Sequence, residues 1–243
     1  MEQWNGFACE EFLFEEYPAW VVFPSKGTEN GKLAIKTEYR NAFPNAIEIP
    51  LLNAGYHLCF IQNKNRFGTA EDLERKARFI SYVQNKYGLE DKCVPIGMSC
   101  GGMIAIKFAA AHPEMVSCLY LDAPVVNYLS WPCGFGIGQG TNDNFSEILS
   151  ALSLSNVEEL LSYQDMPLHT IPVLVKNEIP VVMVAGDSDI EVPYCENGIF
   201  LQKAYETAEI ALDVHIKQGC GHHPHGLENP EPVLNFILEH STI

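Results

Sequence analysis

The sequence predicts an α/β fold with one mostly parallel, twisted β-sheet and helices on both faces. Short apolar runs rich in β-branched residues alternate with stretches of helical period. The run at 180–185 is apolar at almost every position, as expected of a strand covered on both sides. With 243 residues, 47% of them hydrophobic, the chain is long enough for one large core. We therefore predict a single domain over residues 1–243.

The elements follow one another in a regular order. Predicted strands lie at 12–14, 20–23, 57–61, 93–97, 116–121, 180–185 and 212–217. Predicted helices lie at 73–87, 103–109, 194–209 and 232–240. Gly88 is expected to end the first helix and His112-Pro113 the second. Residues 24–44 read as a polar connection.

The segment from about 126 to 178 interrupts this rhythm. It opens with aromatic residues and glycines, among them Tyr128, Trp131 and Phe135. Two short helical pieces follow, near 145–152 and 157–163. Because an insertion this long between core strands is usually functional, we predict a lid or cap over the site.

Charge and hydropathy exclude several classes of partner. There are 15 basic and 31 acidic residues, which gives a formal charge of −16. This charge and the lack of a basic cluster exclude a nucleic-acid partner. No signal-peptide pattern and no run of about 18 apolar residues is present, so we expect a cytoplasmic protein without a membrane span.

The eight cysteines and a group of histidines are two sets of candidate metal ligands. Several cysteines, such as Cys59 and Cys118, sit in apolar runs, so we expect reduced thiols and, without a CxxC pair, no structural zinc. His222, His223 and His225 are close in sequence, but no acidic or thiolate ligand has a familiar spacing to them. We therefore expect neither a metal nor another cofactor.

A nucleophile turn is predicted at 97–101. Gly97-Met98-Ser99-Cys100-Gly101 fits the pattern G-x-S-x-G between a buried strand and an amphipathic helix. Such a turn holds the serine in a strained conformation at its apex and requires small flanking residues. Ser99 is thus the predicted nucleophile, and the Cys100 amide at the helix N-terminus a predicted oxyanion donor. Cys100 is a rival nucleophile, but Met98 would then occupy the tight position two residues earlier.

A histidine base and an acid are predicted after later strands. His222 follows the last strand in a glycine-rich loop, and we expect it to be the base, with His225 as the alternative. Asp189, Asp187 and Asp122 each follow a strand and could orient the histidine. With any of these acids, the order along the chain is serine, acid, histidine, which is that of the α/β-hydrolases.

The sequence resembles the α/β-hydrolase superfamily over nearly its whole length, and more narrowly a group of bacterial esterase/lipase-like serine hydrolases. The shared motifs are GMSCGGM (97–103), LDAPV (121–125), SWP (130–132), GDSDIEVPY (186–194) and GCGHHPH (219–225). The resemblance favours Asp189 as the acid and implies ester hydrolysis without a cofactor. Many members carry a His-Gly run that supplies a second oxyanion donor; this chain lacks it, so that donor is expected from the backbone of 25–41.

The expected function is hydrolysis of short- to medium-chain acyl esters through an acyl-enzyme, with a small-molecule ester as substrate. Met98, Tyr128, Trp131 and His225 are expected to line the substrate pocket. A carbohydrate acetyl esterase with the same triad is the first alternative, and a peptidase or thioesterase would use the same groups. A non-catalytic binding protein or a lyase on this fold is the alternative from another class.

Overall fold

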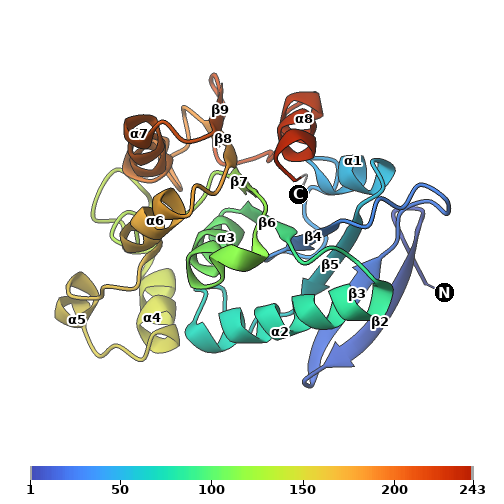
Figure 1. Cartoon of the computed structure of the whole chain (residues 1–243). Helices are drawn as coiled ribbons and strands as arrows, with labels where there is room; N and C mark the ends of the chain where they lie inside the picture. The colour runs from blue at the N-terminus through green and yellow to red at the C-terminus, as the bar shows by residue number, and fades with distance from the viewer. Residues whose placement is uncertain (1, 242–243) are drawn as a thin grey trace.

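The computed structural model describes residues 2–241, which form a nine-stranded sheet with helices on both sides (Figure 1). Its strands lie in the order β1-β2-β3-β5-β4-β6-β7-β8-β9. Their bounds are β1 Glu2–Trp4, β2 Phe7–Phe14, β3 Tyr17–Val22, β4 Leu33–Lys36, β5 His57–Ile61, β6 Cys93–Met98, β7 Leu119–Asp122, β8 Val181–Gly186 and β9 Leu212–Lys217.

Most of the sheet is parallel. The six strands from β5 to β9 in this order pair in parallel, whereas β1, β2 and β3 are joined by antiparallel pairs at one edge. The predicted fold class, a mostly parallel α/β sheet, is confirmed. Because the carboxyl ends of parallel strands meet at one edge, the loops after β6, β7 and β8 come together there.

Two groups of helices cover the two faces. α2 (Ala70–Tyr87), α3 (Cys100–Ala111), α6 (Pro167–Lys176) and α7 (Gly198–Ala208) share one apolar core with the sheet. On the other face, α1 (Glu48–Asn53) and α8 (Glu231–His240) pack over a second core (Figure 1). Side chains of β4 alternate between the two, with Ile35 in the first core and Ala34 in the second. No helix of residues 2–241 is long and apolar enough to cross a membrane.

Four helices and strands were not expected from the sequence, the short edge strand β1 among them. Residues 24–44 are not wholly a connection, because Leu33–Lys36 form the central strand β4. The strand is only four residues long and ends in Lys36, which is fully buried and paired with Glu48. Because a charged residue ends this short apolar run, its sequence pattern is not that of a buried strand. Helix α6 was hidden by its two prolines, Pro167 and Pro172, and α1 is only six residues long.

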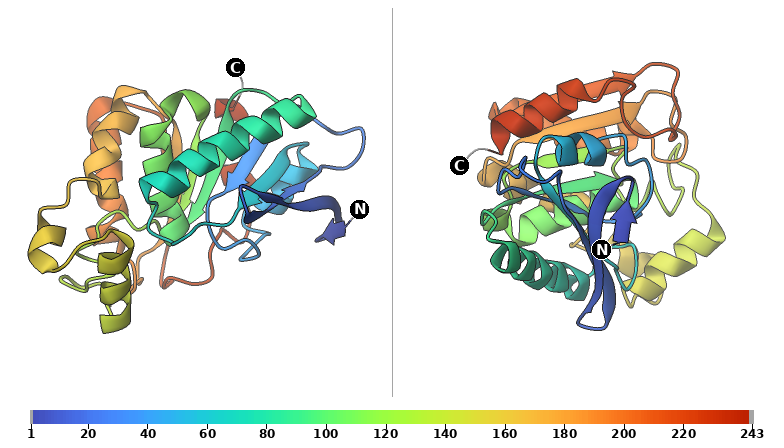
Figure 2. Two further views of the ribbon diagram at one scale, coloured as in Figure 1. Left: turned by 90° about the horizontal axis from the view of Figure 1, so that it is seen from below. Right: turned by 90° about the vertical axis from the view of Figure 1, so that its right-hand side faces the viewer.

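The inserted segment (residues 126–178) divides into two parts. Helix α6 packs into the core of the sheet through Ile171 and Leu174. The earlier part holds α4 (Asn142–Ala151) and α5 (Val157–Leu161). It has a small core of its own that joins Tyr128 and Ile148 to Met103 of α3. These two helices lie at the end of the molecule opposite the N-terminal strands (Figure 2).

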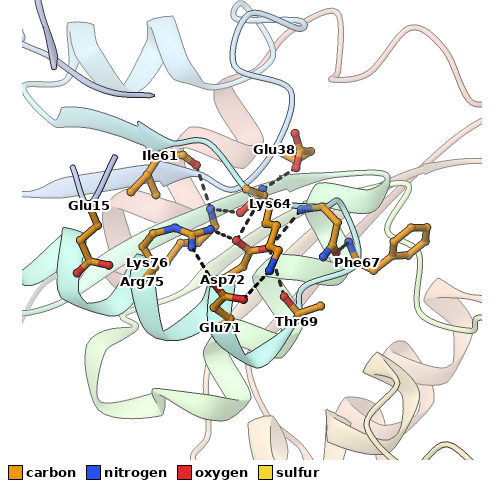
Figure 3. Close-up of polar contacts among 12 residues, drawn as sticks. Glu15, Glu38, Ile61, Lys64, Phe67, Thr69, Glu71, Asp72, Arg75 and Lys76 are labelled. Carbon is orange, nitrogen blue, oxygen red and sulfur yellow. Dashed lines mark hydrogen bonds and ion pairs between the residues drawn. The ribbon is translucent and has the colours of Figure 1, made fainter. Parts of the chain in front are cut away.

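A buried carboxylate organises the loop that follows β5. Asp72 in the first turn of α2 accepts hydrogen bonds from the amides of Lys64 (2.9 Å) and Asn65 (3.4 Å). It also pairs with Arg75, and both side chains are buried (Figure 3). Asp72 therefore fixes the loop that carries Arg66 toward the carboxyl edge of the sheet.

Candidate active site

Ser99 lies at the apex of the turn between β6 and α3. Its φ of 54° is in the left-handed region, which is strained for a residue with a side chain. A Cβ on Gly97 would lie 2.5 Å from the Gly101 carbonyl oxygen, and one on Gly102 would lie 2.5 Å from the Pro124 Cβ. The tight approach therefore demands glycine at 97 and 102. At Gly101 a Cβ would come within 3.1 Å of the Thr37 hydroxyl oxygen, a milder restriction.

Ser99, His222 and Asp189 lie in one hydrogen-bonded chain. The Ser99 Oγ is 3.0 Å from His222 Nε2, and His222 Nδ1 is 2.8 Å from Asp189 Oδ2. The other oxygen of Asp189 accepts from the amides of Glu191 and Val192, each at 2.9 Å. Burial raises the pKa of Asp189, but the hydrogen bond from His222 and the two amides lower it more, so the net pKa lies below its usual range.

The loops that carry the acid and the base pack directly on each other. Asp189 follows β8, and His222 follows β9, its parallel neighbour. A Cβ on Gly186 would overlap the Cys220 carbonyl oxygen, which accepts from the Ser188 amide at 3.0 Å. Glycine at 186 therefore allows the histidine loop to approach the end of β8 and reach the serine.

The other candidates make different contacts. Asp187 accepts from the Ser188 hydroxyl (2.9 Å) and the Gly219 amide (2.7 Å), so it stabilises a turn. Cys100 is fully buried, and burial raises the pKa of its thiol to about 11, which leaves it protonated near neutral pH. All eight cysteines, which lie within residues 2–241, are unpaired.

Asp122 and His225 form a second acid–histidine pair beside the first. His225 Nδ1 is 2.6 Å from Asp122 Oδ1, and both residues are buried. The second oxygen of Asp122 accepts from the Gly226 amide (2.6 Å) and the Tyr120 hydroxyl (2.8 Å). The ring of His225 lies 5.0 Å from that of His222. Two imidazoles, each held by a carboxylate, therefore lie side by side.

A cavity of about 310 Å³ opens beside Ser99. Three of the four predicted pocket residues line it, namely Met98, Trp131 and His225. Tyr128 does not. Its ring is fully buried against Tyr163, and its hydroxyl donates to the Phe67 carbonyl at 3.3 Å. The remaining lining residues are Tyr39, Ala42, Phe43, Arg66, Asn144, Glu191, Val192, His222 and His223.

Sequence reasoning missed several of these residues, among them Tyr39 and Arg66. Tyr39 follows the unrecognised strand β4 and has a φ of 55°; its mostly buried phenol has a pKa raised well above its usual range, chiefly by burial and then by Cys100. Arg66 donates to Asn144 (2.9 Å) and Glu147 of α4 and lies over the Trp131 ring. Recognition of the short strand 33–36 would have placed the loop of Tyr39 at the carboxyl edge.

The N-terminus of α3 offers a donor beside Ser99. Cys100 is the first residue of this helix, so its amide lacks an acceptor within the helix. Among residues 2–241, no backbone or side-chain acceptor is recorded for this amide. A free amide next to the serine is suited to stabilise negative charge on a bound carbonyl oxygen.

Comparison with known proteins places the molecule in a class. Several solved structures share its fold, among them an enzyme described as an α/β hydrolase. The chain thus has the fold of the α/β-hydrolases. Residues 61–242 match the prolyl oligopeptidase family (peptidase S9), and the chain belongs to that family. No curated protein matches the sequence.

Two kinds of solved structure are similar. A truncated carbohydrate esterase from gut microbiota superposes with a TM-score of 0.73 at 17% identity, and the match covers 97% of each chain. An acylaminoacyl peptidase in complex with a chloromethyl ketone gives 0.71 at 14%, covering 96% of this chain and 40% of the other. Dipeptidyl peptidase 4 of Porphyromonas gingivalis gives 0.66 at 13%, covering 98% and 36%. The chain therefore spans about two fifths of the length of these peptidases.

Proposed function

We propose that the protein hydrolyses carboxylic esters of short- to medium-chain acyl groups, with Ser99, His222 and Asp189 as catalytic triad. The observation that carries the proposal is the continuous chain of hydrogen bonds from Asp189 through His222 to Ser99, which ends at a cavity. A nucleophile, a base within hydrogen-bonding reach and a group that orients the base are the parts that acyl transfer requires.

The geometry supports a sequence of proton transfers. His222 Nε2 takes the proton of Ser99 as its Oγ attacks the ester carbonyl, and Asp189 holds Nδ1 and stabilises the imidazolium. The same proton then passes to the departing alcohol, which leaves an acyl-enzyme. A water molecule activated by Nε2 attacks the acyl carbonyl and releases the acid and Ser99.

Two donors are proposed for the oxyanion. The Cys100 amide is the first, because it is free at the start of α3. For the second, the sequence pointed to the backbone of 25–41; we assign instead the phenol of Tyr39 in that segment. It lines the cavity with Ser99, and its raised pKa keeps the hydroxyl protonated as a donor.

The cavity supports a small substrate with polar groups. Its volume of about 310 Å³ is near the lower limit for small-ligand sites, which disfavours long acyl chains. Arg66, Asn144 and Glu191 bring charged and amide groups to its wall. An acetylated sugar is therefore the second candidate substrate, and the similarity to a carbohydrate esterase over the full length of both chains favours it.

We further propose that the chain is one domain in which residues 126–161 act as a cap. Trp131 and Asn144 of this segment line the cavity, and Arg66 ties α4 to the loop after β5. Asn197 holds the start of the segment, because its side-chain oxygen accepts from the amides of Val126 and Asn127 at 3.0 Å each. Replacement of Trp131 by Ala should then raise KM more than it lowers kcat.

The test uses a substrate panel with purified protein. p-Nitrophenyl esters of rising chain length, acetylated sugars and aminoacyl p-nitroanilides are assayed with the wild type and Ser99→Ala. We expect the highest kcat/KM on acetyl to butyryl esters or acetylated sugars, and a loss of several orders of magnitude in Ser99→Ala. Full activity of Ser99→Ala refutes the nucleophile. Preference for the anilides assigns the site to peptides, and absence of fluorophosphonate labelling at Ser99 would indicate a non-catalytic binding protein.

A further inference from the structure

Three imidazoles meet at the rim of the cavity. His222, His223 and His225 each place a ring nitrogen within 4.8 Å of the others. Their ring centroids are 4.9, 5.0 and 4.9 Å apart, and the ring planes cross at 67°, 78° and 88°. The rings therefore form a nearly equilateral triangle of steeply inclined planes, an arrangement that the hydrolytic mechanism does not require.

The triangle has the dimensions of a three-histidine metal site. In a tetrahedral zinc site the nitrogens lie about 2.0–2.1 Å from the ion, so the centres of the three rings lie roughly 5 Å apart. The observed centroid separations equal this value. Nitrogens on one tetrahedral ion lie about 3.3 Å apart, so the three ring nitrogens, now within 4.8 Å of one another, must move closer together to bind it.

Two of the three histidines already make the hydrogen bond to a carboxylate that metal-binding histidines usually make. His222 Nδ1 faces Asp189 at 2.8 Å, and His225 Nδ1 faces Asp122 at 2.6 Å. An ionised carboxylate fixes the proton on Nδ1 and leaves Nε2 with a free lone pair. Histidine ligands in metal sites are usually held in this way, because the carboxylate orients the ring and raises its basicity.

His223 is the third corner and is accessible. Its side chain is exposed and lines the cavity, and among residues 2–241 no hydrogen bond of its ring is recorded. The ring stacks on Phe43 at 5.6 Å with planes 13° apart, which restricts its orientation. The carboxylate of Glu191 also lines the cavity and offers charge compensation for a cation there.

We propose that His222, His223 and His225 bind a divalent transition-metal ion and that the bound ion switches the hydrolase off. Imidazole nitrogens select borderline ions such as Zn²⁺, Ni²⁺ and Cu²⁺ over Mg²⁺ and Ca²⁺, which prefer oxygen. His222 Nε2 is the atom that bonds Ser99, so an ion on this atom displaces the serine hydroxyl and removes the base. Binding stands on the geometry alone, whereas inhibition rests on the proposed function.

The first experiment measures binding without activity. Zn²⁺ is titrated calorimetrically into the wild type, Ser99→Ala, His223→Ala and Asp122→Asn. We expect one ion per chain and undiminished affinity in Ser99→Ala, which loses only the competing hydroxyl. Affinity should fall at least about tenfold in His223→Ala, and about 10- to 100-fold in Asp122→Asn, which retains the ligand and loses its carboxylate. His169→Ala and Cys195→Ser are controls, because both side chains are exposed and could bind zinc elsewhere.

The second experiment measures inhibition, with each variant normalised to its own metal-free rate. Zn²⁺ should inhibit the wild type and both controls equally, EDTA should restore the rate, and His223→Ala should require at least about ten times more zinc. Equal zinc affinity in wild type and His223→Ala overturns the site, as does loss of affinity in the control variants. Site-specific binding to a chain without esterase activity would uphold the site and refute the proposed function, so the two failures are distinguishable.

Discussion

The carboxylate of Asp122 binds His225 Nδ1 at 2.6 Å, although the two residues are 103 positions apart. This contact joins the end of β7 to the loop after β9, across the intervening strand β8. The same loop carries His222, the proposed base. Asp122 therefore holds the histidine loop over Ser99 from inside the protein, while Asp189 holds the base itself.

The Asp122 contact predicts a pH dependence of stability. Burial raises the pKa of Asp122, but the bond from His225, the Gly226 amide and the charge of Lys217 lower it more, so the net pKa is lowered. A lowered folded pKa gives stability that is present above the unfolded value of about 3.9 and lost as pH falls through the folded value. Chemical denaturation from about pH 5 to pH 2 should therefore show a steeper loss for the wild type than for Asp122→Asn. Parallel curves would contradict the assignment.

The choice of Asp189 as triad acid can be tested against a neighbour. Asp189→Asn should lower kcat by about four orders of magnitude, because the amide no longer holds the correct tautomer of His222. Asp187→Asn is the matched control, since the Asp187 carboxylate accepts from Ser188 and Gly219 in a turn. It should keep a kcat within about threefold of the wild type. Equal losses in steady-state kinetics would show that the acid is misassigned.

Tyr39 is predicted to stabilise the transition state. Tyr39→Phe removes only the hydroxyl and should lower kcat by about 10²- to 10³-fold with little change in KM. Tyr128→Phe also removes a hydroxyl, but this group donates to the Phe67 carbonyl outside the cavity. It should leave kcat nearly unchanged. A purely higher KM in Tyr39→Phe would assign this residue to substrate binding instead.

Loss of the buried Asp72–Arg75 ion pair should lower the free energy of unfolding far more than loss of the exposed carboxylate of Glu71. Asp72→Ala leaves Arg75 buried without this partner and should cost about 3–5 kcal/mol of unfolding free energy. Glu71→Ala removes contacts with Lys64 at 3.1 Å and with Arg75 at 3.9 Å, but the Glu71 side chain is 60% exposed, so it should cost under about 1 kcal/mol. Urea denaturation of the two variants measures the difference, and equal costs would refute it.

The glycines of the nucleophile turn should differ in their tolerance of a methyl group. Gly102→Ala would place its Cβ 2.5 Å from Pro124 and 2.7 Å from that residue's Cα, so the backbone must move. We expect a loss of about 1–3 kcal/mol together with a loss of activity. Gly101→Ala meets the Thr37 hydroxyl oxygen at 3.1 Å and should cost less. Thermal unfolding and ester hydrolysis are measured for both variants. A larger loss in Gly101→Ala than in Gly102→Ala would show that the turn is flexible.

Local sequence patterns predicted an element correctly where it is long or where a turn residue such as glycine marks its end. Strands β5 and β9 have the predicted bounds, and helix α2 ends at Gly88 in the left-handed conformation, as expected. The pattern failed for β4 and α6, because a buried lysine and the internal Pro172 are tolerated only in their tertiary context. A partner such as Glu48, twelve residues from Lys36, gives no periodic signal.

The sequence by itself determined the α/β class and the glycine-bounded serine turn, because periodicity and turn chemistry are local properties. It also named the serine, the histidine and the acid that the tertiary structure brings into one hydrogen-bonded chain. Only the folded chain decided that Tyr39 and Arg66 face the cavity, that Tyr128 does not, and that Asp122 pairs with His225. These contacts join segments that are far apart in sequence, and their geometry is set by the packing of parallel strands and the loops at their carboxyl ends.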